Sequence, residues 1–210
     1  MKIVTYIYDG LTALDAIGPY EALSRIPEVE CIFAGKCKTI VRTGDGFLGL
    51  NADIAIADID TCDYLLLPGG NADGVRACME DEELKTWIKH MDLVTKRTCA
   101  VCTGSLILAA CGLLDGKTAS THWNAKDYLA HFGASYSADR ISVDGKLMTS
   151  AGVSAGIDMG LLLCEELAGR SIAEAIELSM QYNPEPPYGT GDPAIVPEST
   201  TAVAMTKLRL

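Results

Sequence analysis

The sequence predicts an α/β fold with a mainly parallel central sheet, helices on both of its faces and a small added β-hairpin. Strand patterns alternate with helix patterns along the 210 residues, and the central strands are continuous apolar runs. Such runs are typical of parallel strands that are buried on both faces. No repeat, low-complexity tract or linker divides the sequence, so we expect a single domain over residues 1–210.

The first part of the chain predicts strands separated by helices and turns. β-Branched and aromatic residues indicate a strand at Lys2–Tyr8, which Asp9-Gly10 ends. Helical spacing follows over Leu14–Arg25, with Pro19 near the helix start. We further expect a strand at Val29–Ala34, a hairpin of Thr39–Arg42 and Phe47–Leu50, a buried strand at Tyr64–Leu67 and an amphipathic helix at Glu80–Val94.

The second part continues the alternation. A buried strand at Arg97–Val101 leads directly into an apolar helix at Thr103–Ala110. The remaining predicted elements are a helix at Trp123–Phe132, a hairpin of Arg140–Val143 and Lys146–Ser150, and two helices at Ala155–Ala168 and Ser171–Tyr182. The tail at 183–210 is rich in Pro, Gly and Thr, and we expect it to wrap over the surface of the domain.

Charge and cysteine content exclude several classes of function. The net charge is −11, which repels phosphate backbones and anionic lipid, so we expect no nucleic-acid or membrane partner. No signal peptide or membrane span is recognisable. The eight cysteines therefore indicate a reducing, cytoplasmic protein whose thiols are mostly buried and free.

Function in a parallel α/β sheet gathers beyond the carboxyl ends of the strands. One such end carries Cys102 at the junction of a predicted strand and helix, with the small residues Ala100 and Gly104 two positions to either side. This is the pattern of a nucleophile elbow with Cys in place of Ser. We expect the helix N-terminus to lower the thiol pKa and the N–H of Thr103 to face a developing negative charge. A merely buried thiol explains the pattern equally well.

Two other strand ends complete the candidate site. Gly69 and Gly70 follow a buried strand and could bring backbone N–H groups close to a ligand, although such pairs are also common in ordinary loops. Asp15 lies among apolar residues, where desolvation would raise its pKa toward a value useful for proton transfer. A solvated helix cap is an equally good interpretation of Asp15.

Other polar motifs carry less weight. Cys99 and Cys102 have C-x-x-C spacing, but the second Cys pair that a zinc site needs is missing, so we expect no metal. Of the three histidines, only His122 in Thr121-His122-Trp123 is a plausible neighbour of the site, and a structural role for it is at least as reasonable. Asp15 is therefore the better candidate to carry a proton for Cys102.

Several segments together resemble one family. The chain is similar to the ThiJ/PfpI superfamily, and within it to isonitrile (isocyanide) hydratases. The matching segments span nearly the whole chain: 14–21, Pro68-Gly69-Gly70, 101–110, 112–117, Thr121-His122-Trp123, 155–158 and 182–187. The segment from the elbow to Thr121-His122-Trp123 is the specific one.

The resemblance implies a flavodoxin-like α/β sandwich, a homodimer and a cofactor-independent enzyme. It implies Cys102 as nucleophile and Asp15 as general acid and base, with Thr103 beside the sulfur. Substrate or oxyanion contacts are expected at Gly69, Gly70, Gly104, His122 and Trp123. Peptidase-like members carry His where this chain has Thr103, and the His-x-Glu of glutamine amidotransferases is missing. The residues after Tyr182 are too few for the DNA-binding region of the related regulators, so we expect none.

The expected reaction is hydration of an isocyanide to an N-formamide through a thioimidate on Cys102. Two alternatives stay open. The same cysteine could act on an aldehyde, as in a glyoxalase, or it could be a redox or ligand sensor whose exposed thiol oxidises readily.

Overall fold

A mostly parallel sheet forms the centre of the protein, in a computed structural model that describes residues 1–207. Its strands are β1 (Lys2–Tyr6), β2 (Glu30–Gly35), β5 (Ile54–Ala55), β6 (Tyr64–Leu67), β7 (Arg97–Val101), β10 (Ile141–Asp144) and β11 (Leu147–Ser150). The seven strands lie in the order β10-β11-β7-β6-β1-β2-β5, and only the β10–β11 hairpin is antiparallel. The parallel part has the flavodoxin-like order, which places its topological switch point beside β1.

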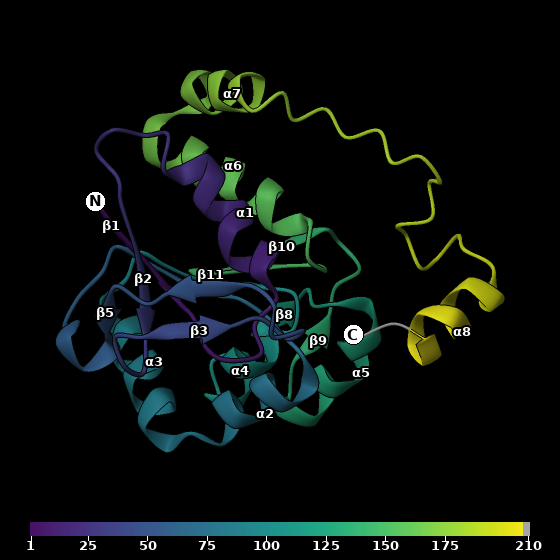
Figure 1. Cartoon of the computed structure of the whole chain (residues 1–210), viewed down its shortest axis with the longest axis horizontal. Helices are drawn as coiled ribbons and strands as arrows, with labels where there is room; N and C mark the ends of the chain where they lie inside the picture. Colours follow the sequence, from purple (N-terminus) through teal and green to yellow (C-terminus); the bar gives the residue numbers. More distant parts are fainter. Residues whose placement is uncertain (208–210) are drawn as a thin grey trace.

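Helices cover both faces of this sheet, as expected (Figure 1). The helices are α1 (Ala13–Leu23), α2 (Ala72–Glu80), α3 (Glu82–Val94), α4 (Gly104–Ala110), α5 (Lys126–Leu129), α6 (Ala155–Ala168), α7 (Arg170–Ser179) and α8 (Glu198–Lys207), of which α8 lies apart from the sheet at the end of the C-terminal tail (Figure 1). Short 3₁₀ turns lie at Ile56–Asp58, Trp123–Ala125 and Ala130–Phe132. Two small sheets pair β3 (Ile40–Arg42) with β4 (Gly49–Asn51) and β8 (Thr118–Ala119) with β9 (Ser135–Tyr136).

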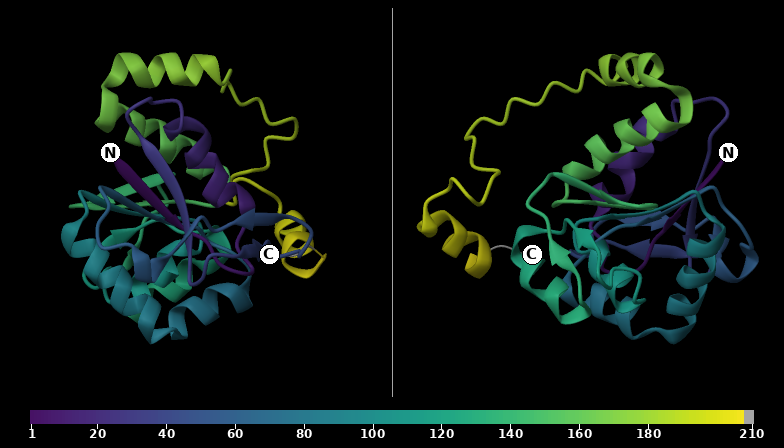
Figure 2. Two further views of the ribbon diagram at one scale, coloured as in Figure 1. Left: turned by 60° about the vertical axis from the view of Figure 1, so that its left-hand side comes forward. Right: turned by 180° about the vertical axis from the view of Figure 1, so that it is seen from behind.

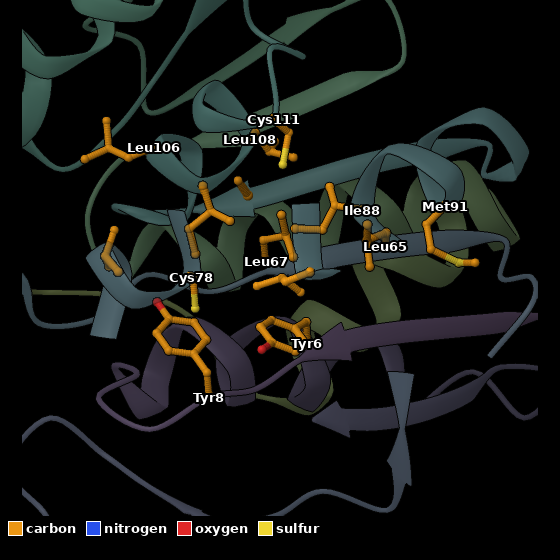
Figure 3. Packing of buried hydrophobic residues seen from close by; sticks show 14 of the residues in the cluster. Tyr6, Tyr8, Leu65, Leu67, Cys78, Ile88, Met91, Leu106, Leu108 and Cys111 are labelled. Carbon is orange, nitrogen blue, oxygen red and sulfur yellow. The ribbon is translucent and has the colours of Figure 1, made fainter. Parts of the chain in front are cut away.

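Alternation along the strands divides the core into two layers. Ile3 and Leu66 belong to the cluster under α1, α6 and α7, whereas Val4 and Leu65 belong to the cluster under α2, α3 and α4. Figure 3 shows the second cluster, in which Ile88 and other helix residues pack onto the β6 side chains. Because both faces of the central strands are buried, their sequences are continuously apolar.

Close packing of α1 on α6 fixes the helix that carries Asp15. A methyl group on Gly160 of α6 would lie 2.9 Å from the Cα atom of Pro19 in α1. Pro19 lies inside α1, which corrects the expectation that it marks the helix start. Proline has no N–H, so the carbonyl of Asp15 loses its usual helical partner, and the tight contact with α6 holds this part of α1 instead.

Most predicted elements are confirmed, and the exceptions have local causes. α2 was missed, because its glycine and charged residues weaken the helical pattern. The helix expected at Trp123–Phe132 is broken into two 3₁₀ turns around the single turn of α5. None of the helices within residues 1–207 is long and apolar enough to cross a membrane.

The tail does not wrap closely over the domain. Residues 183–197 are almost all exposed and run outward from α7 before α8 returns to the side of the molecule near α5 (Figures 1 and 2). Prolines at 184, 186, 187, 193 and 197 favour an extended backbone without regular hydrogen bonds. The tail is therefore an arm that carries a helix.

Gly104 is where α4 lies closest to β6, and it gives the first prediction. A Cβ atom there would collide with the carbonyl oxygen of Leu67. We expect Gly104→Ala to lower the free energy of unfolding in urea by about 1–3 kcal/mol through overpacking. The control Gly191→Ala, where nothing lies within 4 Å, should change it by less than about 0.5 kcal/mol. Equal stabilities of the two variants would contradict this packing.

Candidate active site

Cys102 lies at a sharp turn between the carboxyl end of β7 and the start of α4. Its φ of 59° is in the left-handed region, which non-glycine residues rarely adopt. The backbone is held there by its N–H, which donates to the carbonyls of Ser150 (3.2 Å) and Ala151 (3.1 Å). The Cys102 carbonyl accepts from the hydroxyls of Ser105 (3.0 Å) and Thr121 (3.1 Å). The elbow expected from the sequence is thus present in the backbone.

Asp15 reaches this turn from the first turn of α1. Asp15 is 1% exposed, and Oδ2 of its carboxyl accepts a hydrogen bond from the N–H of Gly69 at 2.9 Å. Oδ1 is buried and has no hydrogen-bond partner among the described residues, and the Cys102 thiol lies near enough to this carboxyl to affect its pKa. A Cβ atom on Gly69 would lie 2.9 Å from Oδ2, so the approach requires glycine. The structure therefore brings Asp15 and Cys102 together.

Burial dominates the ionisation of Asp15. Desolvation raises the pKa of this carboxyl from 3.8 to about 7, although the Gly69 N–H and the Cys102 thiol act in the opposite direction. A carboxyl that titrates near neutrality can both accept and donate a proton under ordinary conditions. Of the two interpretations that the sequence left open, the structure favours the desolvated acid over the solvated helix cap.

The Cys102 thiol is not a resting thiolate, which corrects our expectation. Desolvation and the neighbouring charge of Asp15 raise its pKa to about 12. The N–H groups of Val153 and Thr103 and the Thr103 hydroxyl lower the pKa, but they do not offset burial. The N–H groups of Val153 and Thr103 would nevertheless stabilise the thiolate once it forms.

The N–H groups of the glycine pair contact Asp15 and Thr103 instead of facing a ligand. The Gly70 N–H donates to Thr103 Oγ1 at 3.1 Å, and the Gly69 N–H is taken by Asp15. Both donors that we expected to face an oxyanion are therefore engaged within the protein. Gly104 contacts β6 rather than the site, and only Gly70 of the three glycines lines the neighbouring cavity.

His122 and Trp123 lie beside one another, with ring centroids 5.5 Å apart. His122 Nδ1 is 2.5 Å from Asn124 Oδ1, and its ring packs so tightly on Gly152 that a Cβ atom there would lie 2.5 Å from Cδ2. His122 lines a cavity beside Cys102, whereas Trp123 is not among the residues that line this cavity. The structure therefore places one of this pair at the site.

A cavity of about 490 Å³ opens next to Cys102. Its volume is in the range of small-molecule sites, and most of its lining is apolar. The residues that line it are Thr12, Gly70, Ala72, Val75, Arg76, Met79, Cys102, Thr103, Leu106, His122, Asn124, Ala125, Tyr128, Val153 and Met205. Cys102 and Thr103 are thus the nucleophile candidate and its neighbour within a site sized for a compact organic molecule.

The other cysteines are free, in agreement with the sequence. Only Cys37 is exposed and Cys31 is partly exposed, while Cys62, Cys78, Cys99, Cys111 and Cys164 are buried. Within residues 1–207, no group of three or more His, Cys, Asp or Glu side chains is arranged to hold a metal ion.

Sequence analysis missed several contributions to the site, among them Val153, a wall on α2 and Met205 of α8. Val153, with a φ of 34°, follows β11 and directs its N–H at Sγ of Cys102. Because β11 is the parallel neighbour of β7, its carboxyl end lies at the same edge of the sheet as Cys102, and this placement is the signal that could have identified Val153. The wall formed by Val75, Arg76 and Met79 lies on α2, the helix that the sequence pattern did not predict.

Known proteins resemble this chain in both sequence and fold. An isonitrile hydratase of Pseudomonas putida is 36% identical over 199 residues, which cover 95% of this chain and 86% of that protein. A glutathione-independent glyoxalase of Caenorhabditis elegans is 26% identical over 145 residues, covering 67% of this chain and 75% of that protein.

A crystal structure of a ThiJ/PfpI family protein from Pseudomonas syringae superposes with a TM-score of 0.90 at 32% identity, covering 97% of this chain and 86% of that one. The model of the DJ-1/PfpI family matches residues 1–166. The match includes β1, both glycines after β6 and the elbow at Cys102. The chain belongs to the DJ-1/PfpI family.

Proposed function

We propose that this protein hydrates an isocyanide to an N-formamide, with Cys102 as nucleophile and Asp15 as proton carrier. The observation that carries the proposal is a buried thiol beside a buried carboxyl whose pKa is raised to about 7, at the wall of a mostly apolar cavity. The likeness to an isonitrile hydratase supports the choice of substrate class.

The first half of the reaction transfers one proton from sulfur to carbon. The Asp15 carboxylate takes the proton of the Cys102 thiol while Sγ attacks the terminal carbon of the isocyanide. Asp15 then donates that proton to the same carbon, which gives a thioimidate, R–N=CH–S–Cys. The N–H groups of Val153 and Thr103 stabilise the sulfur charge at the start of attack.

The second half adds water and restores the enzyme. Asp15, again a carboxylate, takes a proton from water while the water oxygen attacks the thioimidate carbon, and it then protonates the nitrogen. The tetrahedral carbon collapses, the hydroxyl becomes the formyl carbonyl, and the sulfur leaves and regains its proton. The net change is addition of one water molecule, with no electron transferred.

The direct test is conversion of phenyl isocyanide to formanilide, followed by ultraviolet absorbance and product chromatography. We expect native protein to turn over the substrate and Cys102→Ala to lose at least about a thousandfold in rate, as expected when a covalent nucleophile is removed. The exposed thiol gives a matched control, Cys37→Ser, which should keep native activity. Equal turnover by Cys102→Ala would overturn the proposal.

The pH dependence follows from the proton held by Asp15. The reactive pair is a thiol beside a carboxylate, so kcat/KM should rise as pH passes through about 7, the raised pKa of Asp15, and then level off. Asp15→Asn should lose most activity and also this rise. The measurement is kcat/KM from pH 5 to 9. A native profile that falls through neutral pH would contradict this assignment of protons.

The same ionisation affects stability with a definite sign. Folding raises the pKa of Asp15 from 3.8 to about 7, so the folded state is favoured below pH 3.8 and loses this stabilisation as pH rises to about 7. The thermal midpoint of native protein should therefore fall between pH 5 and pH 8 by more than that of Asp15→Asn does, because the variant has no carboxyl to ionise at this position. The check is calorimetry of both proteins; a constant difference between them would show that Asp15 ionises as it does in the unfolded chain.

The arm helix gives a further prediction. Met205 of α8 lines the cavity, whereas Val203, on the same helix and similarly exposed, does not. Met205→Gln should raise KM for phenyl isocyanide by about threefold to tenfold, because a polar amide replaces the apolar end of the Met205 side chain that would contact the substrate. Val203→Gln is the control and should leave KM unchanged. Equal KM values for both variants would place α8 outside the working site.

The alternative activity is glyoxalase-like conversion of an aldehyde, for which the similar Caenorhabditis elegans glyoxalase is the reason. Turnover of methylglyoxal without turnover of phenyl isocyanide would favour it. A redox sensor is less well supported, because Cys102 is 5% exposed and its pKa is raised rather than lowered. Homodimer formation and a cytoplasmic location stay predictions from the resemblance and the composition.

A further inference from the structure

The cavity beside Cys102 has an uneven distribution of charge. Among the described residues that line it, Arg76 is the only Lys, Arg, Asp or Glu side chain. The walls around it are mainly apolar and include Val75, Met79 and Leu106. A single cation in such a lining is notable in a chain with a net charge of −11, because the average surface of this protein repels anions.

Burial shows which end of the cavity faces solvent. Cys102 is 5% exposed and therefore lies at the closed end, whereas Tyr128 is 59% exposed and the Arg76 side chain is 65% exposed. A substrate that reacts at Sγ must enter with its reactive carbon first. Its opposite end then lies near Arg76 and Tyr128, at the mouth.

Arg76 is available to a ligand at that mouth. Its carboxylate neighbour within the described residues is Asp73, at 3.8 Å and one helical turn away. Both side chains are well exposed, and pairs of this kind contribute little energy. The guanidinium can therefore turn to a ligand carboxylate, which it can bind through two parallel hydrogen bonds.

We propose that the preferred substrate is an isocyanide with an apolar middle and a carboxylate at the end distant from the reactive carbon, and that Arg76 binds this carboxylate. The isocyanide part of this inference rests on the proposed function. The charge preference rests on Arg76 and the shape of the cavity alone. Arg76 is then a specificity-determining residue at the mouth, remote from the bonds that change.

The test compares two substrates that differ in charge at one end, 4-isocyanobenzoate and its methyl ester. We expect native protein to have a KM about tenfold lower for the carboxylate, consistent with a charge-assisted hydrogen bond, and a similar kcat for both. Arg76→Gln should raise KM for the carboxylate by about tenfold and leave the ester unchanged, while Arg76→Lys should recover part of the difference. The native preference should also shrink as sodium chloride is added.

Arg25→Gln is the matched control, because Arg25 is also exposed and pairs within its own segment with Glu21, but it does not line the cavity. It should leave both KM values unchanged. Equal KM values of native protein for the two substrates, or the same rise for both in Arg76→Gln, would overturn the inference while leaving isocyanide hydration intact.

A second readout does not depend on turnover. Calorimetric binding of 4-formamidobenzoate and its methyl ester to native protein and to Arg76→Gln reports the charge preference directly. Tighter binding of the carboxylate, lost in Arg76→Gln, supports the anion site even if no isocyanide is consumed, in which case only the proposed reaction fails. Equal binding of the two formamides by native protein overturns the anion site.

Discussion

The site depends on one backbone constraint, the left-handed conformation of Cys102 between β7 and α4. A non-glycine residue in this region costs about 1–3 kcal/mol and persists only when its surroundings hold it. Here the carbonyls of Ser150 and Ala151 bind its N–H, and two hydroxyls bind its carbonyl. Gly104 allows α4 to begin directly against β6. Together these contacts direct the sulfur beyond the edge of the sheet, toward the carboxyl of Asp15.

The electrostatics of the pair follow from burial. Desolvation raises the pKa of both acids, and the charge of Asp15 raises the pKa of the Cys102 thiol further. The Cys102 thiol therefore stays protonated near neutral pH, beside a carboxyl whose pKa of about 7 allows it to accept the thiol proton. That arrangement suits a reaction in which the nucleophile must deliver a proton as well as an electron pair, which addition to an isocyanide carbon requires.

The sequence predicted the parts of this structure that local patterns encode. The strands at Tyr64–Leu67 and Arg97–Val101 match because continuous apolar runs bounded by turns leave few alternatives. The pairing of Cys102 with Asp15 was a reasonable hypothesis because both follow strands that end at one edge of the sheet. The sequence predicted a lowered pKa for the Cys102 thiol, but the structure raises it. The main cause of the rise is burial by residues that are distant in sequence. The Val153 contact and the α2 wall depend on chain packing that no single segment reveals.

The most direct measurement is rapid-quench mass spectrometry of the protein mixed with excess phenyl isocyanide. If Cys102 is the nucleophile, the peptide that contains it gains the mass of one intact isocyanide within the first turnover, and the adduct persists longer in Asp15→Asn. Formamide production with no adduct on that peptide, at times when product is forming, would contradict the covalent role of Cys102.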